Sequence, residues 1–297
     1  MTETILEVMN IRKSYKKRTI LNTLSFKVNK GEIVALLGIN GAGKSTLINS
    51  INQLIPLDAG TVTFFNQQNQ PIDRQKIGVM MQKNIQLSRL TVKETLTLAA
   101  SYYHKPLPYT KLIALANLAE HENKRVAKLS GGQKRRLSFA VALAGDPQLI
   151  FLDEPTAGMD SSSRQKLWQV ISLLKKEGKT FFVTSHYLDE LESSANRLLI
   201  LKESNIVFDG TLEDLRRKSG TAEITFHSKL SEKIFTEWKT VLSVTRTGES
   251  IHLMTNQVNQ VVVQLVPYLS GIENLVIKQN SLESLFVSLN EGGGNHE

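Results

Sequence analysis

The chain has 297 residues, of which 41% are hydrophobic and 22% charged, an ordinary composition for a globular protein with a sizeable core. It contains no cysteine, which excludes disulfides, zinc–thiolate sites and thiol nucleophiles. The N-terminal segment lacks a basic region followed by an apolar core, so we expect no signal peptide. No apolar run reaches the roughly 18 residues needed to span a bilayer.

The formal net charge of +8 is open to several interpretations. Scattered lysines for solubility are one, and binding to nucleic acid, an anionic membrane leaflet or a phosphate-rich ligand are the others. The densest basic cluster, Arg12 to Arg18, contains one aromatic residue, whereas a nucleic-acid groove usually interleaves several. Charge alone therefore does not identify the partner.

The first two thirds of the chain alternate between strand and helix patterns. The early segments ILEVMNI, LSFKVN and GTVTFFN predict an antiparallel side sheet. Short apolar runs typical of buried strands are EIVALLG, KIGVMM, QLIFLD, KTFFVTS and RLLILK. Helix patterns occupy STLINSIN and Ser161 to Lys176. The alternation predicts an α/β fold whose mostly parallel sheet is covered by helices.

Two further regions break this alternation. From about residue 83 to residue 140, the segments TVKETLTLAASYY and YTKLIALANLAEH predict a helical subdomain, split by the breaker KPLP. From about residue 224, the order strand, helix, strand, strand, helix, strand, helix predicts a small α+β domain of ferredoxin-like type. We expect a main domain over 1–219, the small domain over 220–290 and a disordered tail over 291–297.

A glycine-rich loop follows the strand EIVALLG. Its sequence, GINGAGKST, fits the pattern G-x-x-x-x-G-K-[ST] of a phosphate-binding loop (P-loop). Lys44 would supply charge to the β and γ phosphates, and the Ser45 hydroxyl would bind Mg²⁺. A plain strand-to-helix turn is the alternative, but it would not need the lysine. The residues of the loop are Gly38, Ile39, Asn40, Gly41, Ala42, Gly43, Lys44, Ser45 and Thr46.

Polar residues end three other predicted strands, where ligands gather in parallel sheets. Asp153 is expected to bind Mg²⁺ beside Ser45, and Glu154 to polarise a water for attack on the γ-phosphate as the catalytic base. Gln82 could bind Mg²⁺ or that water, and His186 could hydrogen-bond the γ-phosphate. The alternatives are solvated loop residues, a surface glutamine and a helix capped by Ser185 with His186 incidental.

Two more features could contact a nucleotide. Tyr15 could stack on adenine or could be an exposed tyrosine on a strand. Ser130, Gly131 and Gly132 precede a helix that starts near Gln133, so they form a second anion-binding helix end. Since one loop already embraces the nucleotide, this end could face the nucleotide of another molecule. The alternative is simple helix capping by Ser130.

Together and in this order, GINGAGKST, LSGGQKRR and LIFLDEPTAGMD resemble the ATP-binding cassette of ABC transporters, over about Leu6 to Arg217. The resemblance implies a P-loop NTPase cassette that binds ATP and Mg²⁺ and hydrolyses ATP. In this family two cassettes pair head to tail, and LSGGQ of one closes over ATP held by the other. It therefore implies two composite sites per dimer, each using Ser130, Gly132 and Gln133 of the partner cassette.

The same resemblance implies roles for single residues. It assigns Tyr15 to the adenine-stacking position, Gln82 to the Q-loop and His186 to the switch histidine. It places Asp160 in a loop that touches the opposite protomer, although Asp160 also suits a helix N-cap. Lys44, Glu154 and His186 form the expected catalytic set, and its completeness argues against a cassette that only binds ATP.

VFDGTLEDL and the C-terminal SLESLFVSLN resemble bacterial exporter cassettes whose membrane permease is a separate protein. We therefore expect a cassette at the cytoplasmic face of the membrane, paired with a permease and a second cassette, as a homodimer or alternatively a heterodimer. An importer ATPase shares every motif and stays open. A soluble ABC-type ATPase acting on ribosomes or nucleic acid is the third hypothesis. Soluble translation factors of this family resemble two cassettes fused in one chain, and its repair members carry long coiled coils. This chain has one cassette and no heptad run, so we expect no nucleic acid as a partner.

Overall fold

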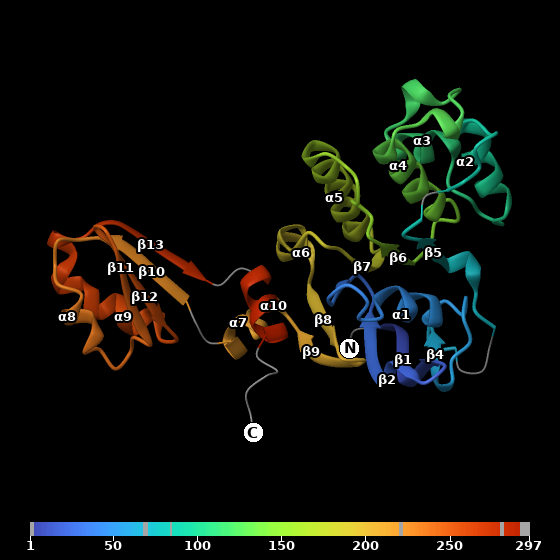
Figure 1. Ribbon diagram of the computed structural model, residues 1–297. Helices are drawn as coiled ribbons and strands as arrows, with labels where there is room; N and C mark the ends of the chain where they lie inside the picture. Colours follow the sequence, from blue (N-terminus) through green and yellow to red (C-terminus); the bar gives the residue numbers. More distant parts are fainter. Residues whose placement is uncertain (1–2, 68–70, 84, 220–221, 280–281, 292–297) are drawn as a thin grey trace. The chain divides into compact units, whose positions relative to one another are not determined.

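The computed structural model describes residues 3–67, 71–83, 85–219, 222–279 and 282–291. The chain forms two compact units, Met1–Gly210 and Thr211–Glu297 (Figure 1). The division precedes the predicted boundary at residue 219, because α7 (Leu212–Ser219) contacts α10 (Leu282–Glu291) of the second unit. Among the described residues, no helix has both the length and the apolar character needed to cross a bilayer.

The centre of the first unit is a six-stranded sheet in the order β5-β6-β7-β3-β8-β9. Its strands are β3 (Ile33–Leu37), β5 (Ile77–Met80), β6 (Leu149–Asp153), β7 (Thr180–Thr184), β8 (Arg197–Lys202) and β9 (Asn205–Gly210). The first five run parallel, as predicted, and β9 pairs antiparallel with β8. Every residue of β3, β6 and β7 is buried, which explains their continuous apolar sequences. β5 is an edge strand of four residues.

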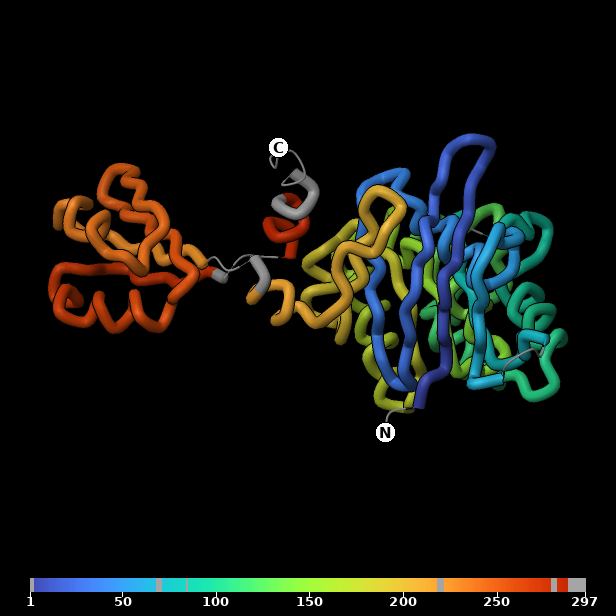
Figure 2. Tube along the Cα trace, turned by 90° about the horizontal axis from the view of Figure 1, so that it is seen from below, coloured from blue at the N-terminus to red at the C-terminus, as the bar shows by residue number. Residues whose placement is uncertain are grey.

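A second, antiparallel sheet lies in the same unit. It has the order β2-β1-β4, with β1 (Thr4–Tyr15), β2 (Arg18–Asn29) and β4 (Ala59–Phe64). Figure 2 shows the β1–β2 hairpin in dark blue. The antiparallel pairing of these three strands confirms the predicted side sheet. Its apolar residues share one core with the main sheet, where the rings of Phe26 and Phe182 stack at 5.8 Å.

The helices of the first unit fall into two groups. Helix α1 (Lys44–Ile51) follows β3, while α5 (Ser161–Lys176) and α6 (Leu188–Ser194) follow β6 and β7. Between β5 and β6, the chain forms α2 (Val92–Ser101), α3 (Tyr109–Ala116) and α4 (Gly131–Ala142), which contact one another (Figure 1). Pro108 precedes α3, which explains the break that separates α3 from α2. Helix α5 has the bounds predicted from its apolar spacing.

The second unit contains an antiparallel sheet in the order β11-β12-β10-β13. Its elements in chain order are β10 (Ala222–His227), α8 (Lys233–Thr236), β11 (Ser243–Thr247), β12 (Ser250–Thr255), α9 (Val258–Leu265), β13 (Glu273–Gln279) and α10. One face of the sheet, with Ile224 and Leu253, packs against Phe235 and Val261 of the helices. Residues 292–297 of the predicted tail lie outside the described residues, and Glu291 is the last residue of α10.

Phe235 is the centre of the second unit's core, and we expect Phe235→Ala to destabilise this unit by about 3–5 kcal/mol. Its ring is fully buried and contacts Phe226 and Trp238 edge-to-face. The measurement is urea unfolding followed by Trp238 fluorescence in a Trp168→Phe background. Val263→Ala, at an exposed position of α9, is the control and should change the free energy of unfolding by less than about 0.5 kcal/mol. Equal effects of the two changes would contradict the assigned core.

Candidate nucleotide-binding site

The P-loop connects β3 to α1 and needs glycine at two positions for steric reasons. Gly43 has φ +108°, and a Cβ there would lie 2.9 Å from Cγ2 of Ile20. A Cβ on Gly38 would lie 2.7 Å from the carbonyl oxygen of Leu201. The Lys44 ammonium donates hydrogen bonds to the carbonyls of Gly38 (2.6 Å) and Ile39 (3.2 Å). The loop therefore curves around the lysine at the N-terminal end of α1.

Asp153, at the end of β6, meets Ser45 of α1. The Ser45 hydroxyl donates to Oδ2 of Asp153 at 2.9 Å, and the Thr184 hydroxyl donates to Oδ1 at 2.7 Å. Asp153 is 2% exposed, so both carboxylate oxygens are held within the protein. One carboxylate and one hydroxyl fit Mg²⁺, which protein sites commonly bind through one or two carboxylates together with water and substrate phosphates.

The next residue, Glu154, is buried and has φ +55°, a conformation that costs energy for any residue except glycine. Its N–H donates to the hydroxyl of Thr184 at 3.0 Å. The carboxylate accepts from the backbone N–H of His186 at 3.2 Å, and its Oε1 lies 3.1 Å from Nε2 of the imidazole. Burial raises the pKa of Glu154, while the charges of His186 and Lys44 act in the opposite direction. The turn thus directs a carboxylate toward His186.

These side chains line one cavity of about 370 Å³. The predicted site residues along its wall are Tyr15, Asn40, Gly41, Gly43, Lys44, Ser45, Thr46, Gln82, Asp153, Glu154 and His186. Arg18 and Ile20 also line it and were not predicted. A cavity of about 470 Å³ elsewhere, beside β4, contains none of the predicted residues. The structure therefore brings together the strand-end residues and the P-loop.

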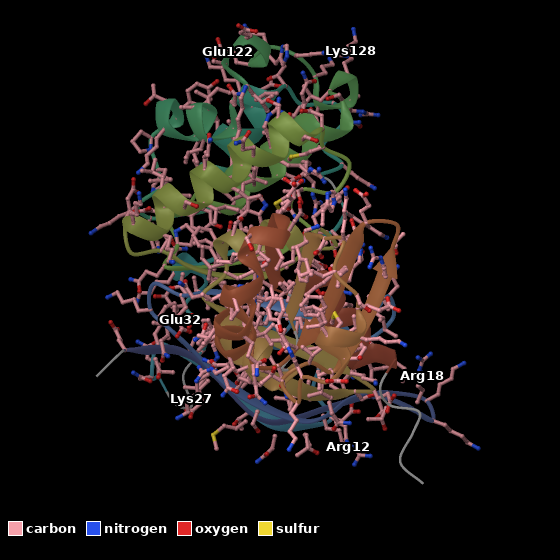
Figure 3. The ribbon with its side chains drawn as sticks, turned by 90° about the vertical axis from the view of Figure 1, so that its left-hand side faces the viewer. Arg12, Arg18, Lys27, Glu32, Glu122 and Lys128 are labelled. Carbon is pink, nitrogen blue, oxygen red and sulfur yellow. The ribbon has the colours of Figure 1, made fainter. Side chains whose placement is uncertain are left out.

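One basic residue of the cluster Arg12 to Arg18 lines this cavity. Figure 3 shows Arg12 and Arg18 at one end of the side sheet, and Lys27 and Glu32 at its other end. Arg18 lines the cavity together with Tyr15, whose side chain is partly exposed. Lys27 instead pairs with Glu7 at 2.8 Å. Part of the positive charge thus lies where an anionic nucleotide would bind.

The residues predicted to face a partner cassette, namely Ser130, Gly131, Gly132, Gln133 and Asp160, lie outside the wall of this cavity. Ser130 caps α4, since its hydroxyl accepts from the N–H of Gln133 at 3.3 Å while the Gln133 side chain accepts from the N–H of Ser130 at 2.9 Å. Asp160 caps α5 and accepts from Ser163, which lowers the pKa of Asp160. Both capping alternatives are therefore observed. The contacts of Ser130, Gly131, Gly132, Gln133 and Asp160 with a second protomer stay predictions.

Besides Arg18 and Ile20, sequence reasoning missed two residues that hold the site residues in place without lining the cavity. Thr184 bonds to both Asp153 and Glu154, and a polar residue ending the apolar strand TFFVT was the available signal. Arg135 is buried and donates to the carbonyls of Asp153 and Glu154, and no signal in the run KRR distinguishes it from its basic neighbours.

Comparison with known proteins accounts for this arrangement. The family model described as ABC transporter matches residues 21–157. A protein named Nod factor export ATP-binding protein I, from Rhizobium sp. (strain N33), is 32% identical over 299 residues, covering 97% of this chain and 98% of that protein. This chain belongs to the ABC transporter family. Its predicted resemblance to an ABC cassette is thereby confirmed, and the chain is an ATP-binding, ATP-hydrolysing subunit of such a transporter.

Other ABC proteins share the first unit. A linearmycin resistance ATP-binding protein of Bacillus subtilis (strain 168) is 34% identical over 224 residues, 73% of this chain and 72% of that protein. An ATP-binding subunit of an ABC transporter superposes with a TM-score of 0.67 and 28% identity, over 73% of this chain and 93% of that chain. A cassette in a dimeric post-hydrolysis state with ADP and Pi gives a TM-score of 0.63 and 26% identity, over 70% of this chain and 99% of that chain. The P-loop cassette fold is therefore confirmed.

Proposed function

We propose that this ABC ATPase drives export through a separate membrane permease, at the cytoplasmic face of the membrane. The observation that carries the proposal is the match to a Nod factor export protein along 97% of the chain, because that match includes the second unit as well as the cassette. If this chain were an importer ATPase or a soluble cassette protein, its match to a protein named for export along nearly its full length would lack an explanation.

The geometry of the cavity supports a division of roles among its residues. Tyr15 would stack on adenine, and Lys44 together with the P-loop N–H groups would hold the β and γ phosphates. Mg²⁺, when bound by Ser45, Asp153 and Gln82, would neutralise phosphate charge. Since Glu154 is a buried carboxylate beside His186, it would accept the proton of the attacking water, and His186 would hydrogen-bond the γ-phosphate.

We propose that two cassettes complete each site. Ser130, Gly131, Gly132 and Gln133 lie at the N-terminal end of the twelve-residue helix α4, where N–H groups and the helix dipole favour an anion. These residues lie off the wall of their own cavity, so they are available to the nucleotide of a partner cassette. The dimeric state of a structural relative supports the pairing of two cassettes, and the resemblance to the family implies that they pair head to tail. We expect a homodimer, since one chain carries both half-sites, with a heterodimer as the alternative.

The second unit is proposed as a ferredoxin-like domain. Its β-α-β-β-α-β order and its sheet order β11-β12-β10-β13 support this assignment. Its apolar core is separate from that of the cassette, so it is expected to fold as a domain of its own.

A pull-down from the native cell tests the transporter assignment. Tagged Glu154→Gln protein would be expressed, supplied with ATP and Mg²⁺, extracted in mild detergent and purified with its partners. We expect an integral membrane permease to co-purify, because the arrested ATP-bound dimer would stay docked. Tagged Lys44→Ala protein, which should bind ATP poorly, is the matched control. Recovery of ribosomal or DNA-bound material without a membrane protein would contradict the proposal.

A further inference from the structure

Arg135, on the second turn of α4, makes an unusual set of contacts for a charged residue. It is 1% exposed, and its guanidinium donates only to backbone carbonyls among the hydrogen bonds seen in the described residues. Burial lowers the pKa of Arg135, while the charges of Asp153 and Glu154 act in the opposite direction. A buried charge costs free energy unless its donors are satisfied. Here five hydrogen bonds to carbonyls satisfy the guanidinium.

The carbonyls belong to two separate segments. Nη1 donates to Met81 at 3.0 Å and to Gln82 at 2.6 Å. Nε donates to Glu154 at 3.0 Å, and Nη2 donates to Asp153 and Glu154. Because a guanidinium is planar and carries five N–H donors, it can hold both segments in one fixed relation.

The contacts of Arg135 lie just beyond the end of the hydrogen-bonded ladder between β5 and β6, next to the cavity residues Gln82, Asp153 and Glu154. The parallel ladder between β5 and β6 ends at the pair Met80 and Leu152. Just beyond that pair the backbone ladder no longer joins the two strands, and the side chain of Arg135 joins them instead. Glu154 also has φ +55°, a strained conformation that persists only when its surroundings enforce it. Arg135 binds the carbonyl of Glu154, and Thr184 binds its N–H.

We propose that Arg135 is a positioning residue that couples the segment at Gln82, helix α4 and the strained turn at Glu154. The inference rests on the proposed roles of Gln82 and Glu154. A displacement of Gln82 would be transmitted through the guanidinium to the turn that directs the Glu154 carboxylate. Since Ser130 caps the N-terminal end of α4, engagement of that helix end would reach the same turn.

Steady-state hydrolysis by the full-length chain tests the proposal with Arg135→Lys and Arg135→Gln. Neither side chain can bridge both segments, so we expect kcat to fall by about 10²-fold, the cost of misplacing a catalytic group by about 1 Å. KM for ATP should stay within about two-fold, because the P-loop is not touched. Amide hydrogen exchange should accelerate at residues 81–83 and 153–157. Lys134→Gln, a charge removal at the neighbouring position, should leave kcat unchanged.

Several results would overturn the proposal. One is an unchanged kcat in Arg135→Lys. Another is a parallel loss of kcat, ATP affinity and thermal stability, because parallel losses indicate a general structural role. Failure of both variants to fold would likewise make Arg135 a folding residue. Glu154→Gln, assayed together with the Arg135 variants, separates the proposed role of Glu154 as catalytic base from the proposed coupling through Arg135. If Glu154→Gln still hydrolyses ATP, the proposed catalytic base is wrong, whereas loss in Glu154→Gln with full activity in the Arg135 variants refutes the coupling alone.

Discussion

Glu154→Gln is expected to lower the rate of ATP hydrolysis by about 10²–10⁴-fold, the usual contribution of a general base. Glutamine keeps the size of the side chain and an oxygen that can accept the N–H of His186, but it cannot take a proton from water. ATP binding should persist, because Lys44, Ser45 and the P-loop are unchanged. The measurement is phosphate release under single-turnover conditions together with equilibrium binding of ATP.

Glu120→Gln is the matched control for this change, because Glu120 is exposed and far along the chain from the cavity residues. Its hydrolysis rate should equal that of the unmodified chain. If Glu154→Gln hydrolysed ATP at a rate within about two-fold of the unmodified chain, Glu154 would not be the catalytic base. Loss of ATP binding together with hydrolysis would instead indicate that the carboxylate supports the fold of the cavity.

Ser130→Arg is expected to abolish hydrolysis, with a loss of at least about 10²-fold, comparable with removing a transition-state donor. The arginine would fill the helix end that is proposed to approach the partner's nucleotide. Affinity for ATP in the monomer should not change, since Ser130 does not line the cavity of its own chain. Hydrolysis and dimerisation would be measured across protein concentrations by phosphate release and light scattering.

Capping by Ser130 must be separated from its proposed contact with ATP. Losing the cap alone costs about 1 kcal/mol, so Ser130→Asp is the informative second variant. Aspartate is a good N-cap and should preserve α4, but its charge would repel the γ-phosphate and should still block hydrolysis. Ser101→Arg, at the exposed end of α2, is the control for adding an arginine. Normal hydrolysis in Ser130→Asp would contradict the composite site.

Elements with strong periodicity could be predicted from the sequence. The helix Ser161–Lys176 was predicted with its observed bounds, because its apolar spacing and its Asp160 cap both mark it. The buried strands were equally visible as apolar runs. Strand β9 was not predicted, because its residues alternate in exposure and it lies at the sheet edge, where burial imposes little pattern. The first unit ends at Gly210 and not at the predicted residue 219, because α7 contacts α10, which lies far along the chain.

The cavity residues could be predicted because they belong to short motifs, and because strand ends in a parallel sheet meet at one edge. The neighbouring residues that orient them could not be predicted from the sequence. Thr184 is one of several threonines at the ends of strands, and its role depends on the register that places β7 beside β6. Arg135 stands among three consecutive basic residues, and only the fold shows which of them is buried.

The position of β5 in the sheet has a mechanical consequence. β5 is four residues long and bonds to one neighbour, whereas β6 is bonded on both sides. Displacing β5, which leads to Gln82, would therefore break the hydrogen bonds of one ladder, whereas displacing β6, which ends at Asp153, would break those of two ladders. The sheet is therefore easier to deform at its edge strand β5 than at β6. The chain continues from β5 into α2, α3 and α4, so these helices can move with the edge strand, while β6 keeps Asp153 in a fixed position relative to the P-loop.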